Sequence, residues 1–475
     1  MIGGNATRGA ARARWAWAAC FVLTLPLVNP YVRGDGNGYY AYVASAVVDR
    51  DLDFENEFRR GDPLFRSLYF DENGALRPEM RSETGRVVNQ WAVGPALLWL
   101  PFVLVAHALA AALNVLGAGV AADGYSPIYR WLCAAGTAVY GALALAMAGG
   151  VAAKLAGRRA AAVGVVGVWW ASSLPVYMYF LPFHVHALSA FAVALYLWCW
   201  LRWRPLGEGA ARWAAWGALG GLMVDVYYLN VLFLLAAAVE WVALARRARG
   251  ASLAGGVAFV AGLGAALAPH FAVKWIVLGS PFATGYLDRF FWTTPRLWQV
   301  GLSSEHGLFL WTPVAAAAVW GLFLWWRTDR AAAGTILATF VVFYYTVASY
   351  QNWHGQSSFG SRFFVSFTPA FVVGLALAAG RLDRIAGASR VGRAVAPALV
   401  ALAVAWNVGF MYQWGANIVP NRGPVAFTTV ASNQVTVVPR RLGRFAWRYL
   451  TDRAGLAADV EQRDRTERQN YELKR

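Results

Sequence analysis

The segment WAVGPALLWLPFVLVAHALAAALNVL, residues 91–116, contains no Asp, Glu, Lys or Arg. An α-helix rises 1.5 Å per residue, so about 20 apolar residues suffice to cross a hydrocarbon layer roughly 30 Å thick. Comparable runs recur at 15–32, 127–153, 160–180, 185–203, 213–227, 229–245, 253–278, 307–326, 332–349, 362–380 and 394–414. The pattern predicts an all-α polytopic membrane protein with a bundle of about 11–13 transmembrane helices.

The composition supports a membrane protein and excludes an ordinary water-soluble domain. Hydrophobic residues make up 59% of the chain and charged residues 14%, against roughly 45–50% and about 25% in soluble domains. The net charge of +17 comes mostly from short basic connectors, which is the pattern that fixes membrane topology, so no nucleic-acid partner is expected. Neither a disulfide framework nor a metal knuckle is indicated, because all three cysteines lie in apolar runs: Cys20, Cys133 and Cys199.

The order of polar and apolar segments predicts the domain organisation. The first apolar run follows three arginines and is read as a retained span with a cytoplasmic amino terminus, within a transmembrane domain covering 1–414. Residues 33–90 form a large external acidic loop, and 415–475 form a polar tail that is partly helical or disordered. The basic stretch from Lys154 to Arg159 leaves two alternatives. Either residues 91–116 do not fully cross the membrane, or this connector lies outside.

The first loop opens with RGDGNGYYAYVASAVVDRDLDFENEF, residues 33–58. A turn at its start is followed by an apolar pattern that predicts a helix lying along the membrane interface. Asp35 would then hold a carboxylate at the membrane surface, where a lipid headgroup sits. The alternative is that Asp35 or Asn37 only caps this helix, a contribution of about 1 kcal/mol.

An alternating acidic run follows the predicted interfacial helix. Such carboxylates could coordinate a divalent cation, Mg²⁺ or Mn²⁺, although a run of this kind is more often a solvated face. The residues concerned are Asp49, Asp51, Asp53, Glu55 and Glu57. Elsewhere the sequence contains no zinc-type His/Cys spacing and no phosphate-binding glycine loop, so no resident metal site is predicted.

Cationic and hydrogen-bonding residues occur where outer ends of spans are expected. His270 and Lys274 are four residues apart on one helix face, and could stabilise a leaving phosphate or place a lysine at the interface. In NWHGQSSFGSRFF, residues 352–364, His354 and Arg362 flank a Gly/Ser loop. Arg362 could grip a phosphate with two hydrogen bonds or anchor the helix end.

A second pair of histidines has the wrong spacing for a shared metal ion on a helix. His184 and His186 are two residues apart, so they cannot lie on the same helix face. A hydrogen-bonding role in a loop or at a helix start is expected for them.

Several stretches together resemble the bacterial GT-C superfamily of glycosyltransferases, which includes protein O-mannosyltransferases and aminoarabinose transferases. Residues 34–58 resemble the acidic first loop of that superfamily, and GRVVNQWAVGPALLWLPF resembles its transition into the next apolar segment. VKWIVLGSPFATGY, SSEHGLFLWTPV and NWHGQSSFGSRFF resemble recurring stretches of an uncharacterised branch. Each motif is short, and their order over most of residues 15–415 carries the resemblance.

The resemblance implies a GT-C-like bundle in which Asp35 matches the catalytic carboxylate after the first span. Relatives often have an acidic residue next, where this chain has Gly36, so a second carboxylate would have to come from Asp53 or Glu55. The other candidate substrate- and phosphate-binding residues are Tyr39, Tyr40, His270, Lys274, His306, His354 and Arg362.

The implied reaction is transfer of a sugar from a polyprenyl-phosphate donor to a glycan, lipid or protein acceptor, with inversion and Asp35 as general base. The implied location is the bacterial cytoplasmic membrane, with the active site facing outward. The alternatives are a transporter or flippase of a lipid-linked sugar, which would be expected to show more intramembrane charges, and a noncatalytic scaffold.

Overall fold

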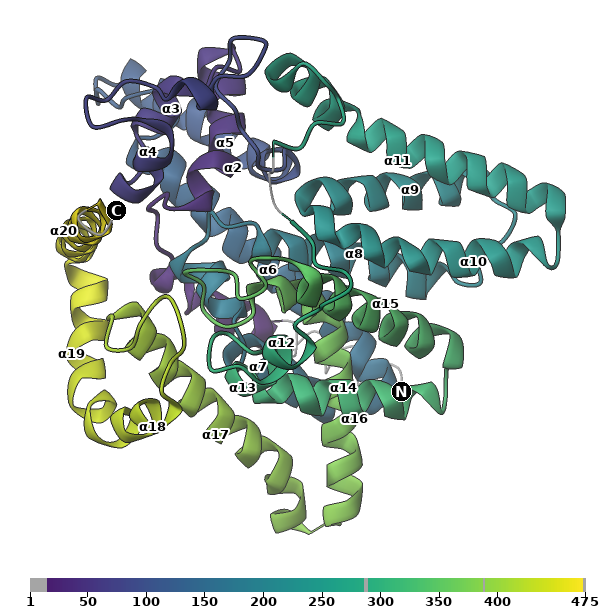
Figure 1. The fold of residues 1–475 in the computed structure, drawn as a ribbon. Coiled ribbons are helices and arrows are strands. Elements are labelled where there is room, and N and C mark those ends of the chain that lie inside the picture. Colours follow the sequence, from purple (N-terminus) through teal and green to yellow (C-terminus); the bar gives the residue numbers. More distant parts are fainter. Residues whose placement is uncertain (1–14, 286–288, 388, 473–475) are drawn as a thin grey trace.

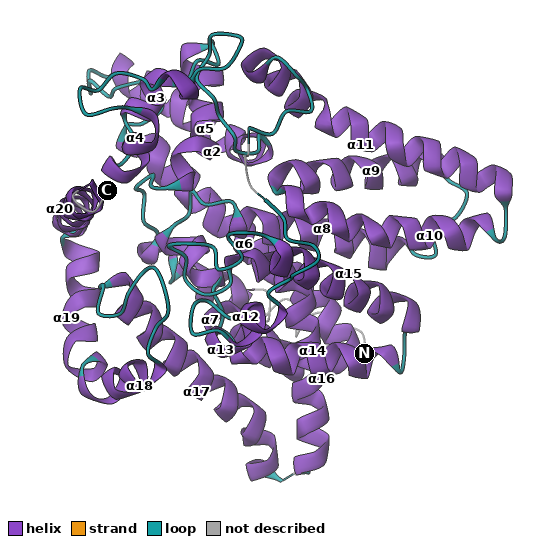
Figure 2. Ribbon diagram, in the orientation of Figure 1, coloured by secondary structure: helices purple, strands orange, loops and turns teal. Residues whose placement is uncertain are grey.

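The computed structural model describes residues 15–285, 289–387 and 389–472. Within these ranges the regular structure is helical, and extended segments pair only at isolated bridges such as Phe70–Leu76. Figure 2 shows helices from one end of the molecule to the other, joined by loops. The prediction of an all-α fold is therefore confirmed.

The helices follow one another with short connectors except at a few long loops. In the first half of the chain they are Trp15–Leu27, α2 (Asp35–Ala44), α3 (Glu55–Arg59), α4 (Pro63–Tyr69), α5 (Gly94–Val115), α6 (Pro127–Ala156), α7 (Arg158–Trp170), α8 (His186–Trp203) and α9 (Ala210–Val226). In the second half they are α10 (Leu235–Ala245), α11 (Arg249–Leu278), α12 (Leu297–Leu302), α13 (Leu308–Trp311), α14 (Pro313–Trp326), α15 (Arg330–Ser349), α16 (Thr368–Ala386), α17 (Arg390–Gly415), α18 (Phe427–Thr436), α19 (Val438–Thr451) and α20 (Arg453–Glu472). Short 3-10 or π turns join them, including η2 (Ser45–Asp49), η4 (Val176–Phe180), η5 (Tyr228–Leu234) and η6 (Arg362–Phe367).

Among the described residues, seven helical stretches are long and apolar enough to cross a membrane. They are α5, α6, η5 with α10, α11, α15, η6 with α16, and α17. Two shorter apolar helices, Trp15–Leu27 and Pro313–Trp326, lie beside them. The chain is thus a multi-pass membrane protein.

The short basic connectors gather at one end of the bundle, which we call the basic end. Arg204, between α8 and α9, contacts Asp329 before α15 with an Nη1–Oδ2 distance of 2.6 Å. Arg159, at the start of α7, lies 3.5 Å from Asp383 in α16. In Figure 1 the tips of the α10–α11 and α16–α17 hairpins point away from the first loop. These contacts place the connectors of several helix pairs on one side.

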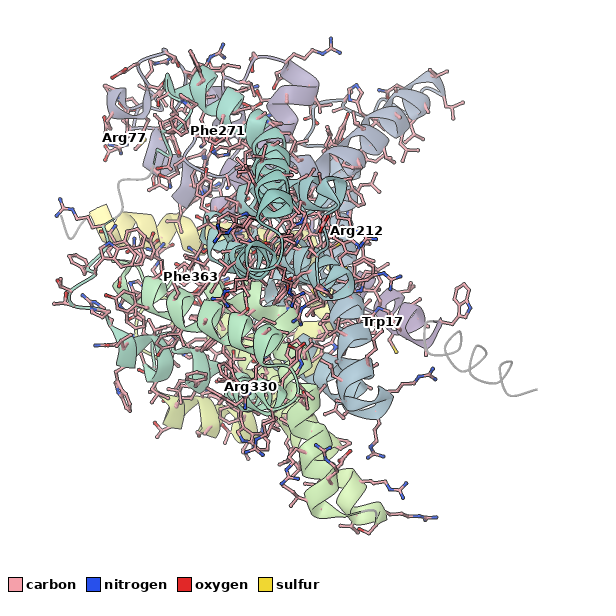
Figure 3. The ribbon with its side chains drawn as sticks, turned by 90° about the vertical axis from the view of Figure 1, so that its right-hand side faces the viewer. Trp17, Arg77, Arg212, Phe271, Arg330 and Phe363 are labelled. Carbon is pink, nitrogen blue, oxygen red and sulfur yellow. The ribbon has the colours of Figure 1, made fainter. Side chains whose placement is uncertain are left out.

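The long loops meet at the opposite end, which we call the loop end. Ser82 of the first loop donates to the carbonyl of Val277, at the end of α11, over 2.6 Å. Figure 3 shows Arg77 of the first loop in the upper half of the molecule and Arg330, the first residue of α15, in the lower half. Polar loop residues and basic connectors are therefore separated along the bundle.

Glycines let α9 and α11 pack closely. A Cβ at Gly217 would lie 2.0 Å from the carbonyl oxygen of Phe259, and one at Gly221 would lie 2.6 Å from that of Leu263. Small residues allow two membrane helices to approach through their backbones. The apolar stretch 213–245 forms two separate helices as predicted, since α9 ends at Val226 and the next helical stretch begins at once.

Helix α5 bears on the topology that the sequence left open. Its start touches the end of α9, because a Cβ at Gly94 would lie 2.4 Å from the backbone of Asp225. It then runs antiparallel to α6, as the hydrogen bonds Tyr140–Leu98 and Tyr129–His107 show. The loop that follows returns to α2 and α3 at the loop end. The loop after residues 91–116 therefore lies beside the first loop, which favours the alternative that this segment does not fully cross the membrane.

Helix α2 is not the surface helix that the sequence predicted. Residues 36–45 are all buried, and a Cβ at Gly38 would lie 1.9 Å from the ring of Trp91. The hydroxyl of Tyr40 donates to the carbonyl of Gly124 over 2.6 Å. Tyrosines can be buried on every side of a helix when their hydroxyls find such partners, because the polar tip is then satisfied.

Candidate functional site

Asp35 forms an ion pair across the length of the chain. It is the first residue of α2, and its side chain makes no capping hydrogen bond. Instead, Nη1 of Arg362 donates to Oδ2 of Asp35 over 2.8 Å. Arg362 begins the turn η6, directly after the Gly/Ser loop. The capping alternative is therefore wrong for Asp35, and two residues singled out by the sequence are in direct contact.

The ion pair retains access to solvent although its surroundings are packed. The Asp35 side chain is 36% exposed and that of Arg362 is 19% exposed, while α2 beyond Asp35 is buried. Burial by itself would raise the pKa of Asp35, but the neighbouring guanidinium outweighs it and lowers the pKa below its ordinary value. Asp35 is thus a carboxylate at neutral pH. The Nε of Arg362 has no partner among the described residues.

His184 lies beside the same turn. A Cβ at Gly34 would lie only 3.5 Å from Nε2 of His184, and Gly34 has a positive φ of 53° that favours glycine. Burial lowers the pKa of His184 to about 4, so the imidazole is neutral, and its Nδ1 has no partner among the described residues. The sequence predicted a hydrogen-bonding role here without locating it next to Asp35, because nothing local links a loop after α7 to the first loop.

His306 and His354 line the loop that carries Arg362. Nδ1 of His306 hydrogen-bonds to the carbonyl of His354 over 2.6 Å, which assigns the ring proton to that nitrogen. Burial lowers the pKa of His306 to about 4, and its Nε2 has no partner within the described ranges. His354 lies 3.5 Å from Glu305. The three sequence-predicted residues of these two loops therefore come together on one side of Asp35.

The two tyrosines predicted to bind substrate have different places. Tyr39 is buried near Asp35, and burial together with that carboxylate raises the pKa of its phenol well above the ordinary value. Tyr39 therefore remains a protonated hydrogen-bond donor. Tyr40 points to the other side of α2, where its ring packs on Trp99 and Phe183 and its hydroxyl is bound to a loop carbonyl.

Asp62 is a further residue of this region that the sequence did not single out. Its Oδ2 accepts from the backbone N–H of Gly34 over 2.7 Å and from the amide of Asn37 over 2.9 Å. Its Oδ1 accepts from the N–H of Phe65, so it also caps α4. Asp62 thereby fixes the turn that presents Asp35. The Asp-Pro pair at residues 62–63 is a recognisable helix start, but the contact with Gly34 has no local signal.

Lys274 and His270 lie in a separate part of the loop end. Lys274 is fully buried, and its Nζ donates to the hydroxyl of Tyr42 and to the carbonyls of Asn89 and Trp91 at 2.9–3.1 Å. An ammonium group has three donors, so all of them are used within the protein. His270 is bound through Nδ1 to Asp225 over 2.8 Å. The predicted phosphate-binding role of Lys274 would require one of these bonds to break.

The acidic run of the first loop does not converge on one point. Glu55 pairs with Arg59 at 2.6 Å and with Arg81 at 3.2 Å, while Asp51 accepts from Ser45 over 2.9 Å. Glu57 is buried, and its two oxygens have no donor among the described residues. Within the part of the chain that the structure describes, no three His, Cys, Asp or Glu side chains are grouped to hold a metal ion.

The site thus combines one accessible carboxylate, one cation and several neutral hydrogen-bonding side chains. Such a set can accept a proton at Asp35, bind an anion at Arg362 and donate hydrogen bonds from tyrosine or imidazole groups. Comparison with protein-family models and with curated protein sequences gives no match to this chain.

Proposed function

We propose that the protein is a GT-C-like glycosyltransferase that moves a sugar from a polyprenyl-phosphate donor to an acceptor outside the cytoplasm of a bacterium. The observation that carries the proposal is the Asp35–Arg362 ion pair at the loop end. It brings together a proton acceptor and a phosphate-binding group, which are the two functions that this transfer requires.

The side of the membrane supports a lipid-linked donor. Basic connectors favour the cytoplasm, so the basic end is assigned to the cytoplasmic face and Asp35 to the outer face of the inner membrane. Nucleotide sugars are lacking there. A polyprenyl phosphate carries its sugar in the membrane, where its headgroup would reach a site at the outer ends of the helices.

In the proposed reaction, Arg362 exchanges its carboxylate partner for the donor phosphate, which a guanidinium can bind with two hydrogen bonds. Without its countercharge, Asp35 becomes a stronger base and takes the proton of the acceptor hydroxyl or amine. The acceptor atom bonds to the anomeric carbon as the bond from that carbon to the phosphate oxygen breaks. Polyprenyl phosphate leaves, and the single displacement inverts the anomeric configuration.

Neutral side chains around the ion pair support the same reaction. The side chains of His184, His306 and Tyr39 are neutral. They can therefore hydrogen-bond to sugar hydroxyls without forming an ion pair with Arg362. The transition state resembles an oxocarbenium ion, as in glycoside hydrolysis. A nearby carboxylate is favourable to the positive charge that develops on the sugar ring.

The first test is glycosyl transfer in reconstituted vesicles with a panel of polyprenyl-phosphate sugars. Asp35→Asn preserves the shape of the side chain but removes the base, so we expect transfer to fall by about 10²–10⁴-fold. Glu72→Gln, an exposed carboxylate change in the same loop, should leave the rate unchanged. Equal rates for the parent and a folded Asp35→Asn variant would refute the assignment of the base.

A transporter or flippase of a lipid-linked sugar is the second candidate. The observation that favours it is the buried pair of Asp225 and His270, together with Lys274, on helices α9 and α11, because ionisable groups within spans often mark transport pathways. Movement of a fluorescent polyprenyl-phosphate sugar between leaflets, in the absence of transfer and dependent on Asp225, would favour transport.

A further inference from the structure

Helix α19 has an unusual distribution of side chains for an external segment. Its sequence, VPRRLGRFAWRYLT, places Leu442, Phe445 and Tyr449 on one face, and these are the partly buried side chains that face the protein. The remaining surface divides into two flanks. Four arginines occupy one flank, and small or apolar residues occupy the other.

The contacts of α19 place it at the outer ends of two apolar helices. The ring of Phe445 lies 5.1 Å from that of Tyr412, which is near the end of α17. The hydroxyl of Tyr449 donates to the carbonyl of Leu27 over 2.8 Å, at the end of the first apolar helix. Figure 1 shows α18 and α19 along the outside of the bundle, with α20 leading towards the first loop. The helix is therefore positioned where the hydrocarbon layer ends.

The apolar flank of α19 is open. Trp447 is 70% exposed and Leu450 is 51% exposed, and Gly443 and Ala446 on the same flank are exposed as well. A large aromatic residue beside a leucine on a charged helix is typical of helices that insert one side into the headgroup region of a bilayer. Tryptophan in particular is enriched at that level.

The basic flank has few protein partners. Arg448 contacts Asp452 at 3.3 Å and Asp459 at 2.9 Å, whereas the described residues provide no carboxylate ion pair for Arg440, Arg441 or Arg444. These arginines lie at the loop end, opposite the basic connectors that set topology. The preference of basic connectors for the cytoplasmic side does not account for these arginines. Binding to an external anion does account for them.

We propose that α19 binds the outer surface of the membrane, with the flank of Trp447 and Leu450 in the interfacial layer and the arginines on the phosphates of anionic phospholipids. The partner of α19 is the bilayer itself, because its apolar flank lies next to its basic flank. An interfacial helix places such flanks against the acyl chains and the headgroups, respectively. The inference does not depend on glycosyl transfer. Membrane binding by α19 would hold the C-terminal tail beside the first loop, because α20 contacts α4 of that loop.

The test uses the full chain in vesicles with one nitroxide label. Cys20→Ser removes the exposed cysteine, Cys133 and Cys199 are buried, and Ala446→Cys places the label on the apolar flank. Vesicles contain phosphatidylcholine alone or mixed with phosphatidylglycerol. We expect the label to be accessible to oxygen and protected from a water-soluble nickel chelate, and more so in the anionic vesicles.

Two arginine variants separate charge from packing. Arg440→Gln, Arg441→Gln and Arg444→Gln together should abolish the preference for phosphatidylglycerol, with an effect of roughly fivefold per arginine on lipid association at the helix. The three matching lysine substitutions should retain it. Nickel accessibility equal to that of a label at exposed Glu72→Cys would overturn the proposal, as would a lipid preference unchanged by the glutamine variant.

Discussion

Arg362 and Lys274 are both cations at the loop end, and the protein holds them in different ways. Lys274 is fully buried, and its three donors bind three neutral oxygens of the protein. Arg362 binds one carboxylate that is itself 36% exposed, and its Nε is left without a partner in the described structure. Residue type and position in the sequence made the two equally good candidates for binding phosphate.

The difference shows how a structural cation is distinguished from one that is available to a ligand. Breaking the contacts of Lys274 would leave a buried charge and buried carbonyls unsatisfied, which costs free energy that a ligand would have to replace. Arg362 can exchange one anion for another while its surroundings stay in place. The predictions below test whether this contrast is real.

The largest effect is expected at Arg362. Arg362→Ala should lower glycosyl transfer by about 10²–10³-fold, because a charged donor for the leaving phosphate is lost. Arg362→Lys should restore part of the rate, since the charge returns without the two-pronged geometry. The measurement is single-turnover transfer in vesicles.

Arg66→Ala, an exposed arginine of the same loop end, is the matched control and should transfer at the parent rate. A folded Arg362→Ala variant with the parent rate would show that this cation, like Lys274, has a structural role only.

Lys274→Met should act mainly on stability. It keeps the length of the side chain but removes the ammonium that, together with the Tyr42 hydroxyl, donates to the carbonyls of Asn89 and Trp91. Because the single hydroxyl proton of Tyr42 cannot satisfy both carbonyls, we expect the free energy of unfolding to fall by about 2–3 kcal/mol. Transfer per folded molecule should stay near the parent value. Thermal unfolding in detergent, followed by circular dichroism, measures the first quantity, and Lys154→Met, exposed at the basic end, is the control. A Lys274→Met variant with parental stability but without transfer would show that Lys274 acts in the reaction and not in stabilising the fold.

Glu57 extends the contrast to a buried acid without a cation. Burial, followed by the neighbouring Asp49, raises the pKa of Glu57 to about 9 from an ordinary value near 4.5. The folded state therefore keeps a proton that the unfolded state releases, so stability is greatest at low pH and falls as pH rises through this range. Between about pH 5 and about pH 6.5, the free energy of unfolding of Glu57→Gln should fall by about 2 kcal/mol less than that of the parent.

The same thermal unfolding, repeated across that range, makes the measurement. The exposed substitution Glu72→Gln serves as the control and should follow the parent. The same pH dependence of stability in the parent and in Glu57→Gln would show that Glu57 does not hold a proton in the folded protein.

The sequence predicted the fold class well and the site in part. Apolar periodicity identifies membrane helices directly, because the bilayer imposes the length of each one. The sequence indicated Asp35 and Arg362 as two separate candidate residues. Their contact depends on packing between segments 327 residues apart. His184 and Asp62 were missed as neighbours of Asp35 for the same reason.

Prediction was limited where a local pattern had two physical solutions. An apolar run with tyrosines fits a helix on the membrane surface and also a buried helix. In this protein the helix can be buried because backbone carbonyls accept hydrogen bonds from the hydroxyls of Tyr40 and Tyr42. In the same way, a lysine near a helix end can reach a phosphate or a loop. The oxygens around Lys274 come from Tyr42, Asn89 and Trp91, which its own helix does not reveal.

Helix α5 has a consequence for how the protein can evolve. Most apolar helices of a polytopic protein cannot be gained or lost singly, because every later helix would then be inverted in the membrane. The start of α5 packs against the end of α9, and the loop after it contacts the first loop, with Asp123 bound to Arg60. Its length can therefore change between related chains, and so can the depth of the first loop, while all helices from α6 onward keep their orientation.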